Sequence, residues 1–116
     1  MMERTDLTRS QKKIARAVID KGLSKHYERA LAEAEQVCTK WREGGFTNNR
    51  EAYISLFQCV DSNDKNITWL YDGLSPTRWV QLMSQQLAEG VIIVDDLVEF
   101  DEEVRSTIIQ LSKQNS

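Results

Sequence analysis

Helix-breaking residues are scarce in this chain of 116 residues, which has one proline and five glycines. All six fall at the edges of amphipathic stretches: Gly22, Gly44, Gly45, Gly73, Pro76 and Gly90. Glycine is favoured just past the C-terminus of a helix, and proline is tolerated in the first helical turn. The placement predicts a small all-α domain.

Cysteine and histidine are also scarce, which argues against most catalytic and metal sites. Cys38 and Cys59 lie within apolar helical patterns, so we expect two reduced, largely buried thiols rather than a disulfide framework. A zinc site needs more ligands than these and the single histidine, His26, provide. Phosphate-binding loops, dinucleotide glycine patterns and metalloprotease motifs are absent from the sequence. We therefore expect no catalytic, cofactor-binding or metal-binding residue, and a protein that is not an enzyme.

Long apolar runs are missing too. No stretch approaches the ~20 apolar residues that cross a bilayer, and the first six residues lack the apolar run of a secretory signal behind them. We expect a cytoplasmic protein with no membrane partner. Its length suits a single helical domain over residues 1–116, with flexible ends at about 1–6 and 112–116.

The apolar spacing predicts two helices in the first 45 residues. Thr8 and Gln11 fit a capping box, and the first helix is expected to end at Gly22. Ser24 is a good N-cap for a second helix that stops at Gly44-Gly45. Its side chains recur at spacings of 4 and 3 residues and predict a core-facing stripe: Tyr27, Leu31, Ala34, Cys38 and Trp41. Ala30 and Val37 widen this stripe.

A third apolar pattern keeps helical phase across the polar run 61–66. This favours one long helix over about 49–72, capped by Asn48. Two shorter helices broken near Ser62–Asp64 are the alternative, because Ser, Asn and Asp compete for backbone hydrogen bonds.

The remaining residues predict two more helices and a connector. Ser75-Pro76 is expected to start a helix that carries Trp79 and ends at Gly90. Residues 91–94 have strand propensity, and we interpret them as a short extended apolar connector rather than a strand paired across a dimer. After a helical turn at Asp95-Asp96, Asp101 is expected to cap the last helix. The sum is an all-α bundle of four to five helices, antiparallel or orthogonally packed.

Charge is unevenly distributed along the chain. Residues 1–42 hold ten basic and six acidic residues, a net +4, while the remaining five basic and twelve acidic residues give −7. We expect the basic N-terminal face to meet the acidic segment 95–103, within one chain or across two. The preferred function is a non-enzymatic interaction or regulatory module that forms a homodimer or binds a protein partner.

One tryptophan falls outside the apolar stripes. Trp41 and Trp79 are expected in the core, but Trp69 lies between stripe positions. Off-face tryptophans often anchor interfaces. We expect a partner-binding surface near Trp69, Tyr71 and Arg78.

Nucleic-acid binding is the alternative function. Gly22-Leu23-Ser24 after a basic helix resembles the turn of a helix-turn-helix, with phosphate contacts expected from Lys12, Lys13, Arg16, Lys25 and Arg29. Val18 and Glu28 fit that motif poorly, because it needs a small residue and an apolar residue at these two positions. The alternative interpretation of this segment is an ordinary helical hairpin with a solvated basic face.

Overall fold

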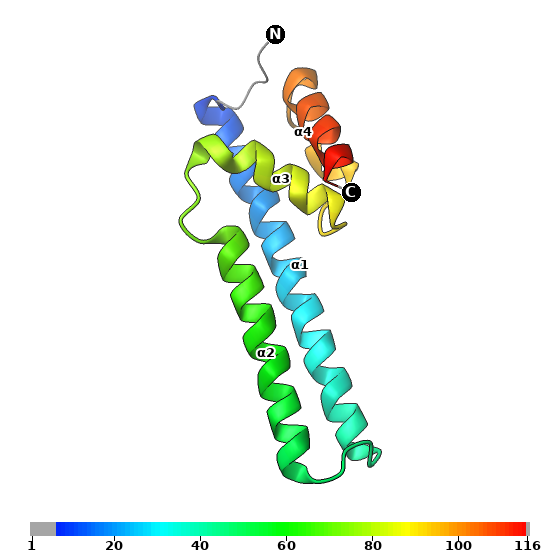
Figure 1. Ribbon diagram of the computed structural model, residues 1–116. Coiled ribbons are helices and arrows are strands. Elements are labelled where there is room, and N and C mark those ends of the chain that lie inside the picture. Colours follow the sequence, from blue (N-terminus) through cyan, green and yellow to red (C-terminus); the bar gives the residue numbers. More distant parts are fainter. Residues whose placement is uncertain (1–6, 116) are drawn as a thin grey trace. The chain divides into compact units, whose positions relative to one another are not determined.

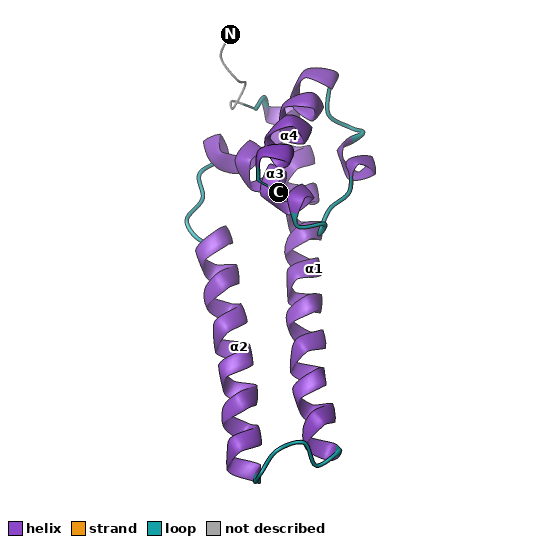
Figure 2. Ribbon diagram, turned by 45° about the vertical axis from the view of Figure 1, so that its right-hand side comes forward, coloured by secondary structure: helices purple, strands orange, loops and turns teal. Residues whose placement is uncertain are grey.

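The computed structural model describes residues 7–115 (Figure 1). Its helices are α1 (Arg9–Arg42), α2 (Asn49–Tyr71), α3 (Trp79–Ala88) and α4 (Glu102–Gln114), with two 3₁₀ turns, η1 (Pro76–Arg78) and η2 (Val94–Leu97). No strand occurs among the described residues (Figure 2), so the predicted all-α class is confirmed.

The chain divides into two compact units. The core unit comprises the residues up to Ser24 and those from Gly73 onward, and the hairpin unit comprises Lys25–Asp72. Helix α1 contributes its first part to the core unit and its second part to the hairpin unit.

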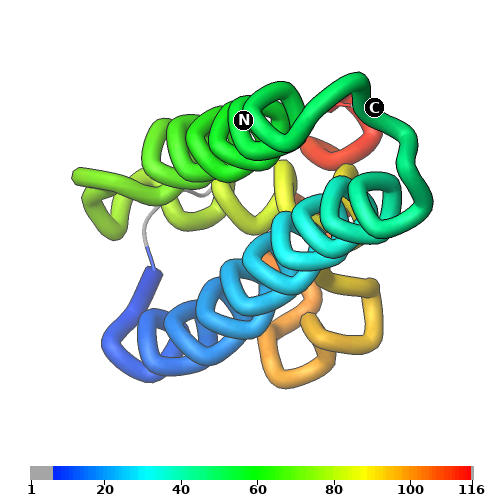
Figure 3. The backbone as a smooth tube through the Cα atoms, turned by 90° about the horizontal axis from the view of Figure 1, so that it is seen from below, coloured from blue at the N-terminus to red at the C-terminus, as the bar shows by residue number. Residues whose placement is uncertain are grey.

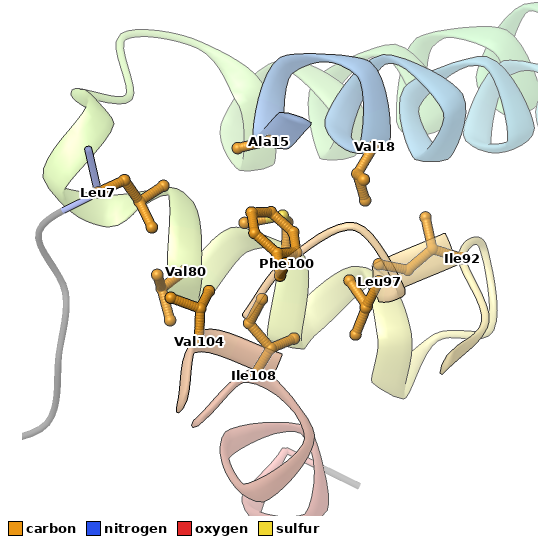
Figure 4. Close-up of a cluster of buried hydrophobic side chains, with 10 residues drawn as sticks. Leu7, Ala15, Val18, Val80, Ile92, Leu97, Phe100, Val104 and Ile108 are labelled. Carbon is orange, nitrogen blue, oxygen red and sulfur yellow. The ribbon is translucent and has the colours of Figure 1, made fainter. Parts of the chain in front are cut away.

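The core unit buries the stripes that the sequence predicts for it. Figure 4 shows side chains from the start of α1, from α3, from the 91–100 segment and from α4 in one cluster. Its buried members are Leu7, Ala15, Val18, Val80, Met83, Ile92, Leu97, Phe100, Val104 and Ile108. Trp79 is half-buried against this cluster. The unit therefore has a closed hydrophobic core of its own.

Helix α1 does not end at Gly22, which corrects the sequence-based prediction of two helices. The backbone continues as one helix of 34 residues, drawn as one uninterrupted coil from blue to cyan in Figure 3. Gly22 is buried in this helix, and a Cβ added to it would lie 2.2 Å from Nε2 of Gln86. The glycine makes room for the Gln86 side chain of α3 and does not end the helix.

Helix α2 is a single helix, as the preserved phase predicts. Asn48 caps it by accepting a hydrogen bond from the backbone nitrogen of Glu51 at 2.8 Å. The polar run stays helical because its side chains find partners: Asn63 donates to the carbonyl oxygen of Cys59 at 3.0 Å, and Lys65 pairs with Asp61 at 2.9 Å. The alternative of two broken helices is excluded.

The remaining boundaries follow the predictions with three adjustments. Pro76 opens the 3₁₀ turn η1 instead of starting α3 directly, and Ser75 makes no side-chain cap. The 91–94 connector buries only its first half, Val91 and Ile92. Asp101 caps α4 through Val104 at 2.9 Å. Past residue 112, where the sequence predicts a flexible end, this helix continues to Gln114.

Candidate interaction surface on the helical hairpin

The hairpin unit pairs the second part of α1 with α2 in antiparallel fashion. Three side-chain hydrogen bonds define the register, from the open end to the connecting loop. His26 Nδ1 and the Tyr71 hydroxyl share a bond of 2.6 Å. Asn63 donates to Glu33 at 2.7 Å, and the indole nitrogen of Trp41 donates to Asn49 at 2.9 Å.

This unit leaves much of its apolar surface uncovered. Between residues 25 and 72 only Ala52 and Ile67 are buried. Six large apolar side chains are between 45% and 72% exposed: Tyr27, Leu31, Trp41, Tyr53, Phe57 and Val60. The core unit, by comparison, exposes only Ile93, Val94 and Val98 among its described large apolar residues.

The predicted core-facing stripe of this part of α1 is therefore covered on one side only, and its burial at Leu31 and Cys38 is wrong for the single chain. Helix α2 packs on one side of the predicted stripe, where Ala30, Ala34 and Val37 are half-buried. Leu31 and Cys38 lie to one side of that contact and stay exposed. The prediction of buried thiols is also corrected, since Cys38 is exposed and Cys59 is half-buried. Spacing identifies an apolar stripe but not whether the chain supplies enough helices to cover it.

The uncovered apolar side chains of α1 and α2 other than Trp69 open onto one face of the hairpin. A hollow of 370 Å³ near the connecting loop is lined from both helices by Val37, Cys38, Trp41, Asn49, Ala52, Tyr53 and Leu56. Cys38 and Tyr53 therefore border the same hollow. Leu31 is one heptad before Cys38, and Val60 is one heptad after Tyr53, so each pair shares a helix side. We name the set Tyr27, Leu31, Cys38, Trp41, Tyr53, Phe57 and Val60 the apolar face.

The two ends of the apolar face carry edge side chains of opposite charge. Arg42 and Arg50 stand at the loop end of α1 and α2, while Glu28 and Asp64 stand toward the other end. Glu28 and Arg42 each lie one heptad from Glu35, and Arg50 and Asp64 each lie one heptad from Phe57. Heptad spacing places each of these trios along one side of its helix.

The expected interface residues Trp69, Tyr71 and Arg78 have different surroundings. Trp69 is 85% exposed, as expected for an off-face position. Tyr71 is half-buried, and its ring meets His26 edge-on with centroids 5.5 Å apart. Arg78 belongs to the core unit. Trp69 is also sixteen residues from Tyr53, or about 160° around α2, on the side away from the apolar face.

The helix-turn-helix interpretation is overturned because α1 has no turn at Gly22. Of the expected phosphate contacts, Lys12, Lys13 and Arg16 line a shallow groove at the start of α1 together with Thr8, Arg9 and Ser10. The Arg16 guanidinium lies 5.5 Å from the centre of the Trp79 ring. Lys25 and Arg29 belong to the hairpin unit, where Lys25 pairs with Glu28 at 3.2 Å. The five cations thus do not form a recognition helix.

Contacts between the basic N-terminal face and the acidic segment occur within one chain. Lys21 forms an ion pair with Asp96, whose other oxygen accepts from the backbone nitrogen of Ile93 at 2.8 Å. The hydrogen bond from Lys21 lowers the pKa of Asp96 below its usual value of 3.8, against a smaller opposing effect of burial. Gln11 adds a second link by donating to Asp101 at 2.8 Å.

Among the described residues there is neither a cluster of metal-binding side chains nor a helix suited to crossing a membrane. Residues 7–115 hold no group of three or more His, Cys, Asp or Glu side chains placed to bind a metal ion. Among the helices described, none combines the length and the apolar character that a membrane crossing requires. Neither result points to a second candidate site.

Comparisons with protein-family models, with curated proteins and with solved structures found no match.

Proposed function

We propose that this protein is a non-enzymatic, cytoplasmic interaction module. It binds a protein partner, and also associates with itself, through the apolar face of its hairpin. The supporting observation is the exposure of six large apolar side chains on one unit of the chain. Aromatic side chains carry roughly 150–250 Å² each. The exposed parts of the six together present on the order of 600 Å², at the top of the range for the largest patch on a monomer. Specific interfaces bury about 800 Å² per partner, a similar area.

The distribution of buried residues favours this role for the hairpin rather than for the core unit. The core unit encloses a cluster of ten buried apolar side chains and needs no further helix to complete it. Within the hairpin unit the two helices bury only two residues between them, so one apolar side stays uncovered. In four-helix bundles a second pair of helices covers such a side. The two free cysteines are consistent with a reducing compartment.

A capture experiment with matched variants tests the proposed function. The tagged full-length chain would be compared with Tyr53→Lys, which places a charge in the apolar face, and with Trp69→Lys, which places one on the far side of α2. We expect wild type and the Trp69 variant to retain the same bound protein, including untagged copies of this chain, and the Tyr53 variant to lose it. Equal capture by all three would refute a role for the apolar face.

Nucleic-acid binding is supported only by the basic stripe at the start of α1. Arg9, Lys12, Lys13 and Arg16 follow one another at spacings of three and one residues and fall on one side of the helix. Such a stripe suits phosphate contacts without sequence reading. Affinity for duplex DNA that falls steeply with salt, and that is lost in Lys12→Ala/Lys13→Ala, would move this alternative ahead of protein binding.

A further inference from the structure

We propose that the apolar face is covered by a second copy of the same chain, docked antiparallel, so that two hairpins form a four-helix bundle. In this dimer α1 packs on α1 of the second copy, α2 packs on its α2, and the two connecting loops lie at opposite ends. The proposal rests on the proposed function and adds to it the identity and direction of the partner.

The charges at the edges of the apolar face decide the direction. Each hairpin carries arginines at its loop end, Arg42 and Arg50, and carboxylates toward the other end, Glu28 and Asp64. Antiparallel docking places Glu28 beside Arg42 of the second copy and Arg50 beside Asp64 of the second copy. Twofold symmetry repeats both pairs, giving four attractive contacts against a single like-charge contact, that of Glu35 with Glu35 of the second copy at the axis.

Docking with both loops at the same end gives the opposite result. In that arrangement α1 lies against α2 of the second copy at equal height along the bundle. Arg42 then lies beside Arg50 of the second copy, and Glu28 beside its Asp64. Like charges placed directly together disfavour this arrangement. In the antiparallel dimer Glu28 gives up its ion pair with Lys25 to bind Arg42 of the second copy. The Lys25–Glu28 pair is exposed, so losing it costs little stability.

A single twofold axis satisfies both helix pairs. Glu28 and Arg42 are centred on Glu35, and Arg50 and Asp64 are centred on Phe57. Glu35 and Phe57 both lie in the stretch of the hairpin between the hydrogen bond of Glu33 with Asn63 and that of Trp41 with Asn49. A twofold axis that crosses this stretch serves both helix pairs, which is the requirement for two rigid hairpins to pair along both helices at once.

The same axis brings protruding and hollow parts of the apolar face together. Leu31 and Val60 lie on the far side of the axis from the 370 Å³ hollow. In the dimer they approach the hollow of the second copy beside its Cys38 and its Tyr53. Phe57 meets Phe57 of the second copy at the axis. This is knobs-into-holes packing, in which each apolar side chain fills space left by the facing helices.

Mass measurements on the full-length chain test the presence and the location of the dimer. We expect sedimentation equilibrium to give twice the chain mass for wild type. Phe57→Glu, which buries two carboxylates at the axis, is expected to give the monomer mass with unchanged helix content. Trp69→Glu is the matched control on the far side of α2 and is expected to remain a dimer. Dissociation of the Trp69 variant with survival of the Phe57 variant would overturn the proposal.

Charge reversal tests the antiparallel direction. Glu28→Arg and Arg42→Glu are each expected to weaken self-association by at least about tenfold, because each places like charges beside each other twice. Mixing the two variants is expected to restore a dimer of one copy of each, since every contact at positions 28 and 42 is then attractive. The mixed dimer also shows that both variants fold.

The outcomes separate this proposal from the proposed function. A mixture that stays as weakly associated as its components would overturn the antiparallel arrangement. A wild-type chain that is monomeric, yet captures another protein in a manner that Tyr53→Lys abolishes, would overturn the homodimer and leave the interaction module standing. A monomeric chain with no capture dependent on Tyr53 would overturn both.

Discussion

Gly22 of α1 packs directly against Gln86 of α3. A Cβ added to Gly22 would lie 2.2 Å from Gln86 Nε2 and 2.6 Å from its Cδ. Gln86 is fully buried, and its Nε2 donates to the carbonyl oxygen of Ile19, one turn before Gly22, at 3.0 Å. The absence of a side chain at position 22 is what brings the amide of Gln86 within reach of the α1 backbone.

We predict that Gly22→Ala destabilises the protein, although alanine is the better helix former by about 1 kcal/mol. The new methyl group must displace a buried amide and break its bond to Ile19, a net cost of roughly 1–3 kcal/mol. Urea unfolding followed by circular dichroism measures the change.

A double-mutant cycle provides the control for this prediction. Gln86→Ala removes the obstructing atoms, so Gly22→Ala is expected to cost less in that background, or to stabilise. An equal cost of Gly22→Ala in both backgrounds would place the strain somewhere other than Gln86.

Asp101 is predicted to stabilise two elements with its two carboxylate oxygens. Oδ1 caps α4 by accepting from Val104 at 2.9 Å, and Oδ2 accepts from Gln11 at 2.8 Å. We expect Asp101→Ala to lower the free energy of unfolding by about 2 kcal/mol, through loss of the cap and of a charge-assisted bond.

Asp101→Asn separates the two contributions of Asp101. Asparagine is a good N-cap, but its amide nitrogen would face the Gln11 amide nitrogen. Gln11 cannot easily turn over, because its oxygen accepts from Thr8 at 2.9 Å. We expect Asp101→Asn to cost about half as much as alanine. If both variants unfold at the same urea concentration, the link to Gln11 carries the whole effect.

The Lys21–Asp96 ion pair predicts a dependence of stability on pH. Because the folded state lowers the pKa of Asp96, this pair stabilises the protein above the usual pKa of 3.8 and is lost as pH falls through the lowered value. Lys21→Met keeps the apolar stem and removes the charge. We expect it to cost at most about 1 kcal/mol at neutral pH, since Lys21 is largely exposed.

Acid conditions provide the control for Lys21→Met. The difference in unfolding free energy between wild type and this variant is expected to close once Asp96 is protonated. NMR titration of the Asp96 carboxyl carbon should show its pKa rising toward 3.8 in the variant. A difference that persists at low pH would indicate lost packing of the lysine stem instead.

The features that the sequence predicts correctly are those determined by residues close by in the chain. The caps at Asn48 and Asp101 and the unbroken α2 depend on local hydrogen bonds and phase, which spacing shows directly. The prediction that a helix ends at Gly22 was wrong because the side chain that explains this glycine, Gln86, is 64 residues away in the sequence. The stripe containing Leu31 was predicted in the core, but one chain supplies α2 on only one side of it. Periodicity tells which side of a helix is apolar, and the number of available helices decides whether it is buried.

Cys38 provides a chemical probe of the apolar face. Its thiol is exposed at the hollow near the connecting loop, whereas Cys59 is half-buried with the amide nitrogen of Asn63 3.7 Å from its sulfur. Each thiol can be followed alone, using Cys59→Ser to report on Cys38 and Cys38→Ser to report on Cys59.

In dilute protein we predict that Cys38 reacts with a maleimide faster than Cys59, because thiol reaction requires access to the sulfur. As protein concentration rises, labelling of Cys38 is expected to slow, since Leu31 of the second copy covers the hollow that Cys38 lines. Labelling of Cys59 is expected to change less, and Phe57→Glu should keep Cys38 fast at every concentration. A Cys38 rate that stays constant over the concentrations at which the measured mass doubles would show that the dimer forms through another surface.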